Sequence, residues 1–224
     1  MTIFRNRPGV FRLALAFGAL LATVTAHAQD YDRWFVRGGP AYAGFDASAH
    51  VYLPNGEVPG GDASVKHNTG FAMEFGYFFR PNWSVALSVG VPPTARIFGA
   101  GTLASAGKLG NAKYAPGVLS LQFNVPTQGP LRPYVGIGYN YTIVYDVQDG
   151  SIRNLDVSNG GGPSIQAGVE YAVAPHFALF FDLKKIWVGV DARGEVDTPQ
   201  GAVPAYSSVT LNPVIVNTGL SWHF

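Results

Sequence analysis

Few residues of this sequence could carry out catalysis, and they do not form a complete set. Ser221 and His223 are two positions apart, so in an extended strand they would share one face, as a nucleophile and its base require. His50 and His67 lie in a polar stretch without a serine and an acid at a suitable spacing. A hydrolase needs a nucleophile, a base and an orienting group together. We therefore predict that the protein is not an enzyme.

Cofactor and metal motifs are also incomplete. Residues 101–107 and Lys108 resemble a phosphate-binding loop, but the loop has one residue too many, and Leu109 stands where Ser or Thr is needed. Gly136 and Gly138 lie inside a predicted strand that no helix follows. The chain has no cysteine, and its histidines form no HxH or HxxxH pattern. We expect no cofactor and no metal, and a net charge of +1 gives no indication of a nucleic-acid partner.

Five charged residues recur on the less apolar faces of four predicted strands. They are Arg37, Glu74, Glu170, Asp182 and Lys184. Inside a small barrel such side chains can reach one another, because the interior is only wide enough to hold side chains. The pattern favours a salt-bridge network that plugs the lumen, and a water or ion pathway is the alternative. Lys185 has the opposite parity, so it should face lipid and snorkel, unless a bulge shifts the register.

Apolar residues in the long connections, and at the top of one strand, could form a ligand-binding cup. They are Tyr52, Leu53, Ile97, Phe98, Leu103, Ile186 and Val188. Ligands enter barrels at such a mouth. Packing of one loop on another is the alternative explanation for these residues.

The strands that must position these residues are clearest at the end of the chain. In residues 210–224 every second residue from Val214 to Phe224 is apolar or threonine, and the residues between them are mostly small or polar. Alternation of this kind indicates a strand with two different environments. The same pattern predicts seven further strands at residues 33–44, 69–79, 83–91, 114–124, 133–147, 163–173 and 177–190. The fold class is thus all-β, with eight antiparallel strands.

The connections between these strands alternate between long and short. Long connections at 46–68, 94–113, 148–162 and 191–208, of which the first and third are polar and the second is rich in Gly and Ala, alternate with tight turns such as 80–82 and 174–176. Outer-membrane barrels have this asymmetry, with short periplasmic turns and long extracellular loops. A soluble lipocalin-like barrel would be polar outside and apolar inside. Here the fully apolar faces alternate with faces that carry charges, so we predict a transmembrane β-barrel with a lipid-facing exterior.

Residues 1–28 have the features of a cleaved signal peptide. Arg5, Arg7 and Arg12 precede an apolar run, and Ala26-His27-Ala28 is an A-x-A cleavage site. After residue 28 no apolar run reaches the length of a transmembrane helix. We therefore expect residues 29–224 to form one barrel domain in the bacterial outer membrane, with the lipid bilayer as its main partner.

Several stretches together resemble the OmpW family of small outer-membrane barrels. The most specific is LRPYVGIGYNYT at 131–142, supported by Phe35–Gly38, by QAGVEY at 166–171 and by Leu211-Asn212-Pro213. The resemblance implies an eight-stranded barrel that passes small hydrophobic molecules, through an apolar pocket near its outer end and a lateral opening in the wall. This chain has KYAPG at 113–117 where many members have His-Leu-Pro-Pro-Thr, so the resemblance does not fix the wall there.

The resulting functional hypothesis has three parts. A small hydrophobic molecule binds in the cup, the plugged lumen blocks straight passage, and the molecule leaves sideways into the bilayer. Pro92, Pro93 and Pro116 would leave the wall between the third and fourth strands under-bonded, because proline cannot donate to a ladder. Trp222 and Phe224 resemble the terminal signal recognised by the barrel assembly machinery. The alternatives are a non-transporting barrel whose loops bind a partner, and a small ion-conducting pore.

Overall fold

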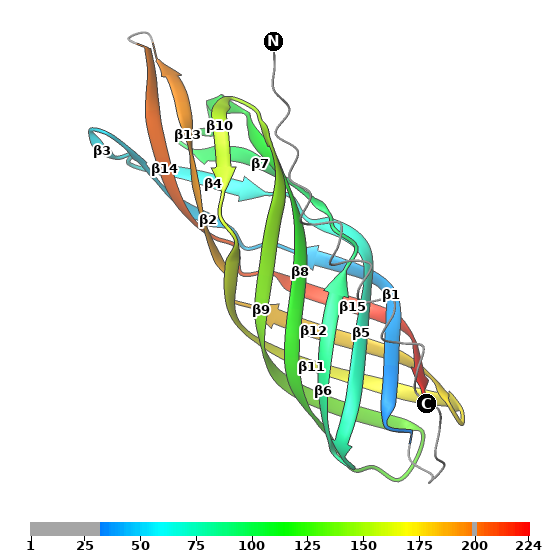
Figure 1. Cartoon of the computed structure of the whole chain (residues 1–224). Helices are drawn as coiled ribbons and strands as arrows, with labels where there is room; N and C mark the ends of the chain where they lie inside the picture. Colours follow the sequence, from blue (N-terminus) through cyan, green and yellow to red (C-terminus); the bar gives the residue numbers. More distant parts are fainter. Residues whose placement is uncertain (1–31, 199–200) are drawn as a thin grey trace. The chain divides into compact units, whose positions relative to one another are not determined.

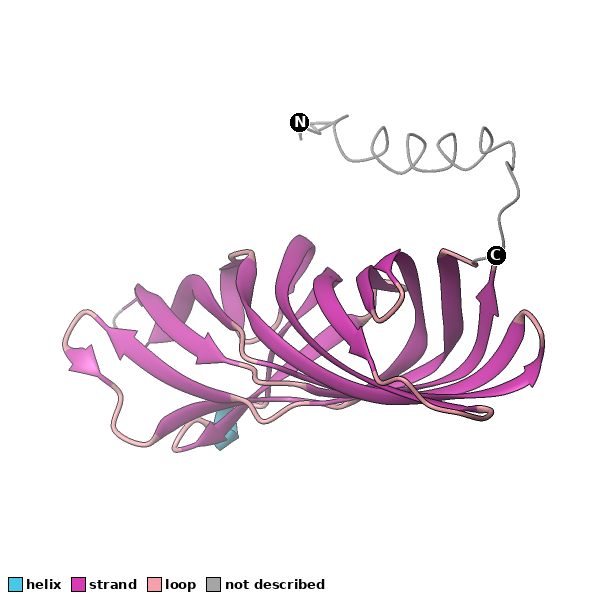
Figure 2. Cartoon of the chain, turned by 90° about the horizontal axis from the view of Figure 1, so that it is seen from below, coloured by secondary structure: helices cyan, strands magenta, loops and turns pink. Residues whose placement is uncertain are grey.

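The computed structural model describes residues 32–198 and 201–224, and the predicted signal peptide lies outside these residues. The described chain is almost entirely β-structure, with one short 3₁₀ turn, η1 (Ala104–Ala106) (Figures 1 and 2). The strands are β1 (Trp34–Gly44), β2 (Ser48–Leu53), β3 (Gly56–Glu57), β4 (Gly61–Val65), β5 (Asn68–Arg80), β6 (Trp83–Gly90), β7 (Thr94–Gly101), β8 (Lys108–Asn124), β9 (Leu131–Asp149), β10 (Ile152–Val157), β11 (Gly160–Ala174), β12 (Phe177–Ile186), β13 (Gly189–Thr198), β14 (Gly201–Thr210) and β15 (Val214–His223). Among the described residues, no helix is long and apolar enough to cross a membrane.

Eight of these strands form a closed antiparallel barrel, which confirms the predicted fold. Each strand pairs with the next around the ring β1-β5-β6-β8-β9-β11-β12-β15. The ring closes where β15 returns to β1, with pairs that run from Phe35↔His223 to Gly44↔Val214. Each barrel strand is therefore paired with a neighbour on both of its sides, as a membrane interior demands.

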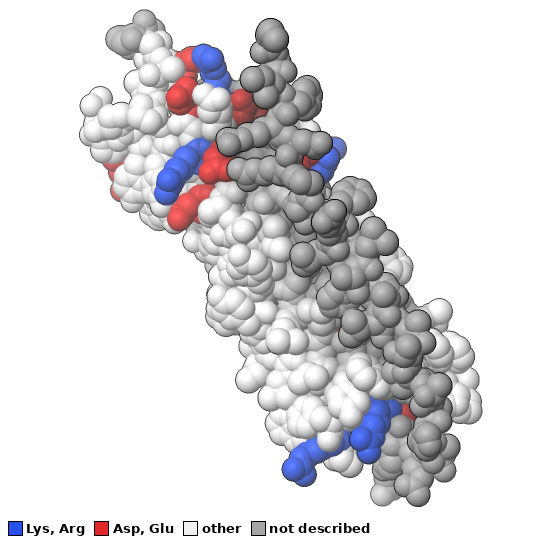
Figure 3. Space-filling model, in the orientation of Figure 1, with Lys and Arg blue, Asp and Glu red and all other residues white. Residues whose placement is uncertain are grey.

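The two faces of the barrel wall differ as the alternation predicts. Along β12 exposed and buried residues alternate almost without exception, so Phe181 points outward and Asp182 points inward. On the outside large apolar side chains are exposed, such as Ile137 at 65%, whereas Arg37 inside is only 1% exposed. Figure 3 shows charged residues gathered toward the two ends, with an uncharged band between them on the visible face. An apolar exterior around a polar interior is typical of a barrel that faces lipid.

The four long connections are present, but they are strands rather than irregular loops. β2, β3 and β4 form the first, β7 the second, β10 the third and the β13–β14 hairpin the fourth. Apolar residues at alternate positions turn inward here too, and Ala49, Ala63, Leu109 and Val209 form a buried cluster. This outer sheet is open, because its hydrogen-bonded order ends at β3 on one side and at β4 on the other.

The pairing of β12 with β15 is regular, without the bulge near Lys185 that the sequence left open. Lys184 pairs with Ile215 and Lys185 pairs with Val214 in one unbroken ladder. Lys185 keeps the outward parity, and its Nζ donates to the Asn212 carbonyl oxygen at 2.7 Å. The backbone carbonyl thus satisfies part of the ammonium group's hydrogen bonding at the barrel wall.

Candidate functional site

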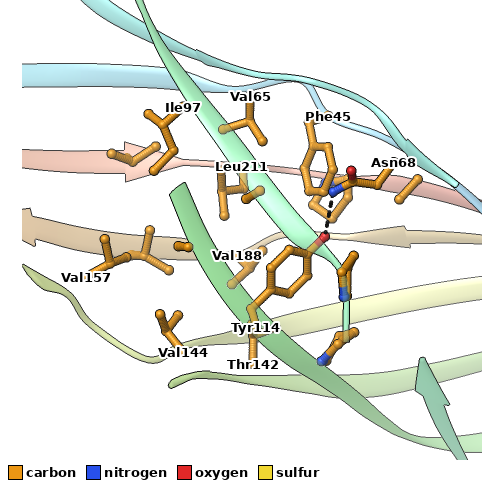
Figure 4. A pocket seen from close by; sticks show the side chains of 18 of the residues that line it. Phe45, Val65, Asn68, Ile97, Tyr114, Thr142, Val144, Val157, Val188 and Leu211 are labelled. Atoms are coloured by element: carbon orange, nitrogen blue, oxygen red, sulfur yellow. Dashed lines mark hydrogen bonds between the residues drawn. The ribbon is translucent and has the colours of Figure 1, made fainter. Parts of the chain in front are cut away.

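An apolar cavity of about 490 Å³ lies near the end of the barrel that carries the long connections, here called the outer end (Figure 4). We call it the outer cavity. Its apolar lining comes from both the barrel strands and the outer sheet. Examples are Val51, Leu53, Val65, Ile97, Leu103, Leu109, Val118, Ile152, Leu155, Ile186, Val188, Val190, Leu211 and Ile215. Its size is within the range of about 300–1,000 Å³ that is usual for ligand pockets.

The strand pattern of β12 explains how the apolar wall lies directly above the charged lumen. Asp182, Lys184 and Ile186 follow one another on the inward face, and each is at most 5% exposed. Val188 continues this face beyond the strand end, where Val118, Ile186 and Val188 form a buried cluster. The inward face therefore changes from charged to apolar within two residues. The outer cavity consequently has a polar floor and apolar walls.

The floor begins with Arg37, which holds two acids from two other strands. Its Nη1 lies 2.6 Å from Glu74 Oε1, and its Nε lies 2.7 Å from Glu170 Oε1. The guanidinium carbon lies 4.2 Å from the centroid of the Phe35 ring and 4.0 Å from that of Tyr134. Arginine suits this position because it pairs with carboxylates and stacks on aromatic faces at once.

Lys184 extends the same network. Its Nζ lies 3.2 Å from Glu74 Oε2 and 3.6 Å from Asp182 Oδ1, and the Tyr134 hydroxyl donates to Asp182 at 2.9 Å. All five charged residues singled out in the sequence are thus joined, and each is at most 5% exposed. We call them the lumen network. Buried charges need such partners, because an isolated ion loses its hydration without compensation.

Ser221 and His223 lie beneath Arg37, but they are not arranged as a nucleophile and its base. His223 Nε2 lies 3.1 Å from Ser221 Oγ and 2.9 Å from Glu170 Oε2, so one ring nitrogen faces both groups. The Ser221 hydroxyl itself donates to Glu170 at 2.7 Å. In a catalytic triad the acid binds the ring nitrogen that points away from the nucleophile. This cluster therefore supports the Arg37–Glu170 pair and gives no activated serine.

The predicted cup residues divide between the cavity and the outer surface. Leu53, Ile97, Leu103, Ile186 and Val188 line the outer cavity. Tyr52 instead lies beside Tyr206, with ring centroids 6.4 Å apart. The Lys66 ammonium lies over the Phe98 ring, 4.8 Å from the ring centroid. Neither Tyr52 nor Phe98 is part of the cavity lining. Tyr52 and Leu53 separate because successive strand residues face opposite sides.

Several residues that line the cavity were not predicted from the sequence, including Val118, Leu155, Val190 and Ile215. Val118 and Ile215 belong to barrel strands, and their inward parity was the available signal. Leu155 lies in β10, which was interpreted as loop, so no parity was assigned to it. Val190 ends the predicted strand 177–190 with the same inward parity as Ile186 and Val188, but it was not included in the cup.

Tyr206 on β14 marks the polar outer rim. It lines the outer cavity, and its hydroxyl donates to Asp191 Oδ1 at 2.8 Å. This hydrogen bond raises the pKa of the Tyr206 phenol, because the donated proton is held by a carboxylate. The rim phenol is therefore a neutral hydrogen-bond donor at ordinary pH.

The barrel wall beside the outer cavity has an interrupted ladder at the three prolines. The β6–β8 pairing ends at Val89↔Gly117, and pairing resumes between β7 and β8 at Thr94↔Lys113. Pro92, Pro93 and Pro116 lie in this interval, which one backbone bond crosses, from Tyr114 N to Pro93 O at 3.3 Å.

The opposite edge of the same segment is less well bonded still. Between β5 and β6 the last contacts are Ala72↔Gly90 and the bond from Val91 N to Phe71 O. The next bond joins Lys66 N to Arg96 O at 3.4 Å. Residues 67–70 therefore face residues 92–95 without a ladder bond, and Gly70 and Pro93 both line the outer cavity. The interruption is longer on the side toward β5. From the sequence it was predicted on the other side, between the third and fourth strands, which are β6 and β8.

One side-chain bond crosses the inside of this segment. Asn68 Nδ2 on β5 donates to the Tyr114 hydroxyl on β8 at 3.4 Å (Figure 4). Both residues line the outer cavity. Because the bond is long, it is a weak link between two strands that the proline segment separates.

Comparison with known proteins gives consistent matches over the barrel. A family model described as the OmpW family matches residues 33–224. The dibenzothiophene metabolism operon protein DoxH of Pseudomonas sp. (strain C18) is 36% identical, over 85% of this chain and 88% of its own length. The outer membrane protein AlkL of Ectopseudomonas oleovorans is 30% identical, over 75% of this chain and 72% of its own length. Among solved structures, the outer membrane protein OprG from Pseudomonas aeruginosa is similar with a TM-score of 0.80 and 24% identity, over 85% of this chain and 95% of that one.

Proposed function

This chain belongs to the OmpW family of outer-membrane barrels, and from that premise we propose that it admits small hydrophobic molecules across the outer leaflet. The single observation that carries the proposal is the apolar outer cavity, which opens among the long connections and ends on the lumen network. A molecule that enters from outside meets apolar walls first and paired charges below. The cavity therefore suits an apolar molecule in transit better than an ion or a sugar.

Burial in the outer cavity supplies the driving force for entry. Each CH₂ group removed from water contributes about 0.8 kcal/mol, so a molecule with several such groups would be held without any specific polar contact. The lining is mainly aliphatic, which favours shape-tolerant binding over recognition of one compound.

The names of two relatives support this class of ligand. DoxH and a second relative, PahQ of Pseudomonas aeruginosa, are both described as dibenzothiophene metabolism operon proteins, and each is 36% identical to this chain. Dibenzothiophene is a flat, apolar aromatic molecule. We therefore propose that compact aromatic and aliphatic hydrocarbons, rather than charged solutes, are the molecules admitted.

Release is proposed to occur sideways through the wall. The lumen network fills the interior below the cavity, so straight passage would require buried ion pairs to separate. Between residues 67–70 and 92–95 the wall lacks ladder bonds and borders the cavity. An apolar molecule that leaves here enters lipid directly.

Leu103→Asp should reduce uptake, because it places a carboxylate in the apolar lining. We expect about a tenfold loss or more in the rate at which a fluorescent alkane-like tracer enters cells or liposomes that contain the barrel, since an unpaired charge in an apolar site is strongly unfavourable. Phe98→Asp is the matched control, because Phe98 lies on the outside and its substitution should leave uptake nearly unchanged. Equal uptake by the two variants, both folded, would contradict a role for the cavity.

Gly70→Trp should test lateral release. A Cβ atom at Gly70 meets no atom within 4 Å, and Gly70 lines the outer cavity within the unbonded segment, so tryptophan would add bulk at this part of the wall. We expect uptake to fall several-fold in Gly70→Trp and to stay near the original rate in Gly70→Ala, with tracer binding to the outer cavity retained in both. If Gly70→Trp takes up tracer normally, the exit lies elsewhere.

The two alternatives predict different results in the same preparations. An ion-conducting pore would give single-channel steps that change with Glu74→Gln or Asp182→Asn. A barrel that only binds a partner would show tracer flux equal to that of empty liposomes. The paired and buried state of the lumen charges gives no support to a conducting path.

A further inference from the structure

Two cations on the outer surface of the wall stand directly opposite each other. The ladder pairs Val65 of β4 with Ile97 of β7, and Lys66 N donates to Arg96 O, so Lys66 and Arg96 are cross-strand neighbours. Val65 and Ile97 line the cavity, whereas Lys66 and Arg96 are exposed on the other face. Like charges that face each other across two strands are destabilising, because their Cβ atoms are only about 5 Å apart.

No acid of the described chain neutralises this pair. Neither Lys66 nor Arg96 forms an ion pair with a residue in 32–198 or 201–224. Lys113, diagonal to Arg96 on β8, is paired with Asp146 at 2.9 Å. Asp62 on β4 accepts from the amide nitrogens of Ala49 and Ala63, both at 2.7 Å. Three cations therefore share this surface, and one acid is committed to the third of them.

The position of this surface relative to the lipid-facing belt limits what can neutralise it. Exposed apolar side chains reach Phe71 on β5, Val91 after β6 and Tyr145 on β9, with exposures of 46%, 62% and 47%. Lys66 and Arg96 each lie five residues beyond Phe71 and Val91 along the chain, and Lys113 pairs with Asp146, the residue that follows Tyr145. Cations placed just past an aromatic and aliphatic belt lie at the level of lipid headgroups.

We propose that Lys66 and Arg96, with Lys113 beside them, bind the phosphate of an outer-leaflet lipid. Arg96 supplies the planar guanidinium that matches phosphate geometry, and Lys66 supplies a second charge from the neighbouring strand. A bound phosphate would turn the repulsion between the two cations into shared attraction. The bound headgroup would sit beside residues 92–95, at the unbonded part of the wall.

The exposed position of these cations and the apolar ring beside them favour a lipid phosphate over a free phosphate ion. Lys66 and Arg96 are exposed on the face of β4 and β7 that points away from the outer cavity, and neither they nor Lys113 line that cavity, so they do not enclose a small ion. Phe98 lies on the same face, with the Lys66 ammonium above its ring, and offers an apolar contact that inorganic phosphate could not use. The proposal does not depend on transport, because it concerns the outer surface alone.

The test measures retention of lipid A by the folded barrel in native mass spectrometry. The full-length barrel in detergent is titrated with bisphosphorylated lipid A and with the same lipid after both phosphates are removed. The wild-type protein should bind the phosphorylated form preferentially. Lys66→Gln/Arg96→Gln should weaken that binding by roughly tenfold, since charge-assisted hydrogen bonds are lost. The control is Arg33→Gln/Arg132→Gln, which removes two exposed cations from the end of the barrel that carries the short turns and should bind as wild type does.

Three outcomes would overturn the proposal. One is equal binding of the phosphorylated and phosphate-free lipids by the wild-type barrel, a comparison that needs no variant to fold. Another is an equal loss in the test and control variants, which would indicate a general charge effect. The third is displacement of the lipid by millimolar inorganic phosphate, which would identify a free-anion site.

Discussion

Arg37→Met is expected to lower the free energy of unfolding of the barrel by about 3–5 kcal/mol. The substitution keeps an unbranched apolar stem but removes the guanidinium, and it leaves Glu170 and Glu74 without their closest cation. Lys184 still contacts Glu74, so the larger loss falls on Glu170, whose remaining partners are Ser221 and His223. Breaking one side of a buried ion pair is costly because the other charge stays desolvated.

Urea unfolding of the barrel in lipid vesicles would measure this loss. Arg33→Met is the control, because Arg33 is exposed and its guanidinium has only a 3.5 Å contact with the Tyr77 hydroxyl. Arg37→Met/Glu170→Gln should recover part of the stability, since it removes one charge of each sign. The two substitutions should be non-additive by about 1–3 kcal/mol. Additive effects, or an Arg37→Met barrel as stable as the control, would mean that the lumen network does not support the fold.

The sequence was sufficient for the barrel and for its charged interior because both follow from parity. A residue in a strand of a closed wall points either to lipid or to the lumen, and a charged residue such as Glu74 shows which face is inward. Membership in the ring then brings Arg37, Glu170 and Lys184 together, since an eight-stranded barrel leaves no room for them to stay apart.

The outer cavity was predicted less completely because its walls were interpreted as loops. A loop has no inward face, so Tyr52 and Leu53 were given the same role, and Leu155 was given none. Because these stretches are strands, successive residues face opposite sides, so one residue lines the cavity and the next lies on the outer surface. Ile97 and Phe98 show the same one-residue step, because Ile97 lines the cavity and Phe98 does not.

The segment of the wall without ladder bonds was predicted only approximately, for a different reason. Proline identifies where a strand cannot donate, and that placed the weak point at residues 92, 93 and 116. Which neighbouring strand loses its hydrogen bonds depends on where β4 and β7 begin to pair beyond the ring. That pairing joins residues far apart in the sequence, so the prolines alone do not predict it. The edge toward β5 proved the longer gap because β4 and β7 pair again only from Lys66 and Arg96 outward.

Deletion of Phe224 is expected to impair formation of the inserted barrel more than any single change in the long connections. Phe224 N donates to Trp34 O and Trp34 N donates to Phe224 O, each at 2.9 Å, so the last residue makes a reciprocal pair at the closing seam. Its ring also lies 4.4 Å from that of Trp222. Loss of two backbone hydrogen bonds amounts to about 2 kcal/mol at the position where the first and last strands meet.

Phe224→Ala and Phe224→Asp separate this seam from recognition by an assembly machinery, because both retain the backbone pair with Trp34. If the terminal aromatic is a recognition signal, both should accumulate uninserted in cells yet fold into lipid vesicles almost as wild type does when purified. The Phe224 deletion should be impaired in both settings, because it also removes the seam bonds. Heat-modifiable mobility on gels measures insertion in each case. Normal insertion of Phe224→Asp in cells would rule out the recognition role, whereas normal folding of the deletion in vesicles would show that β15 closes the barrel without its last pair.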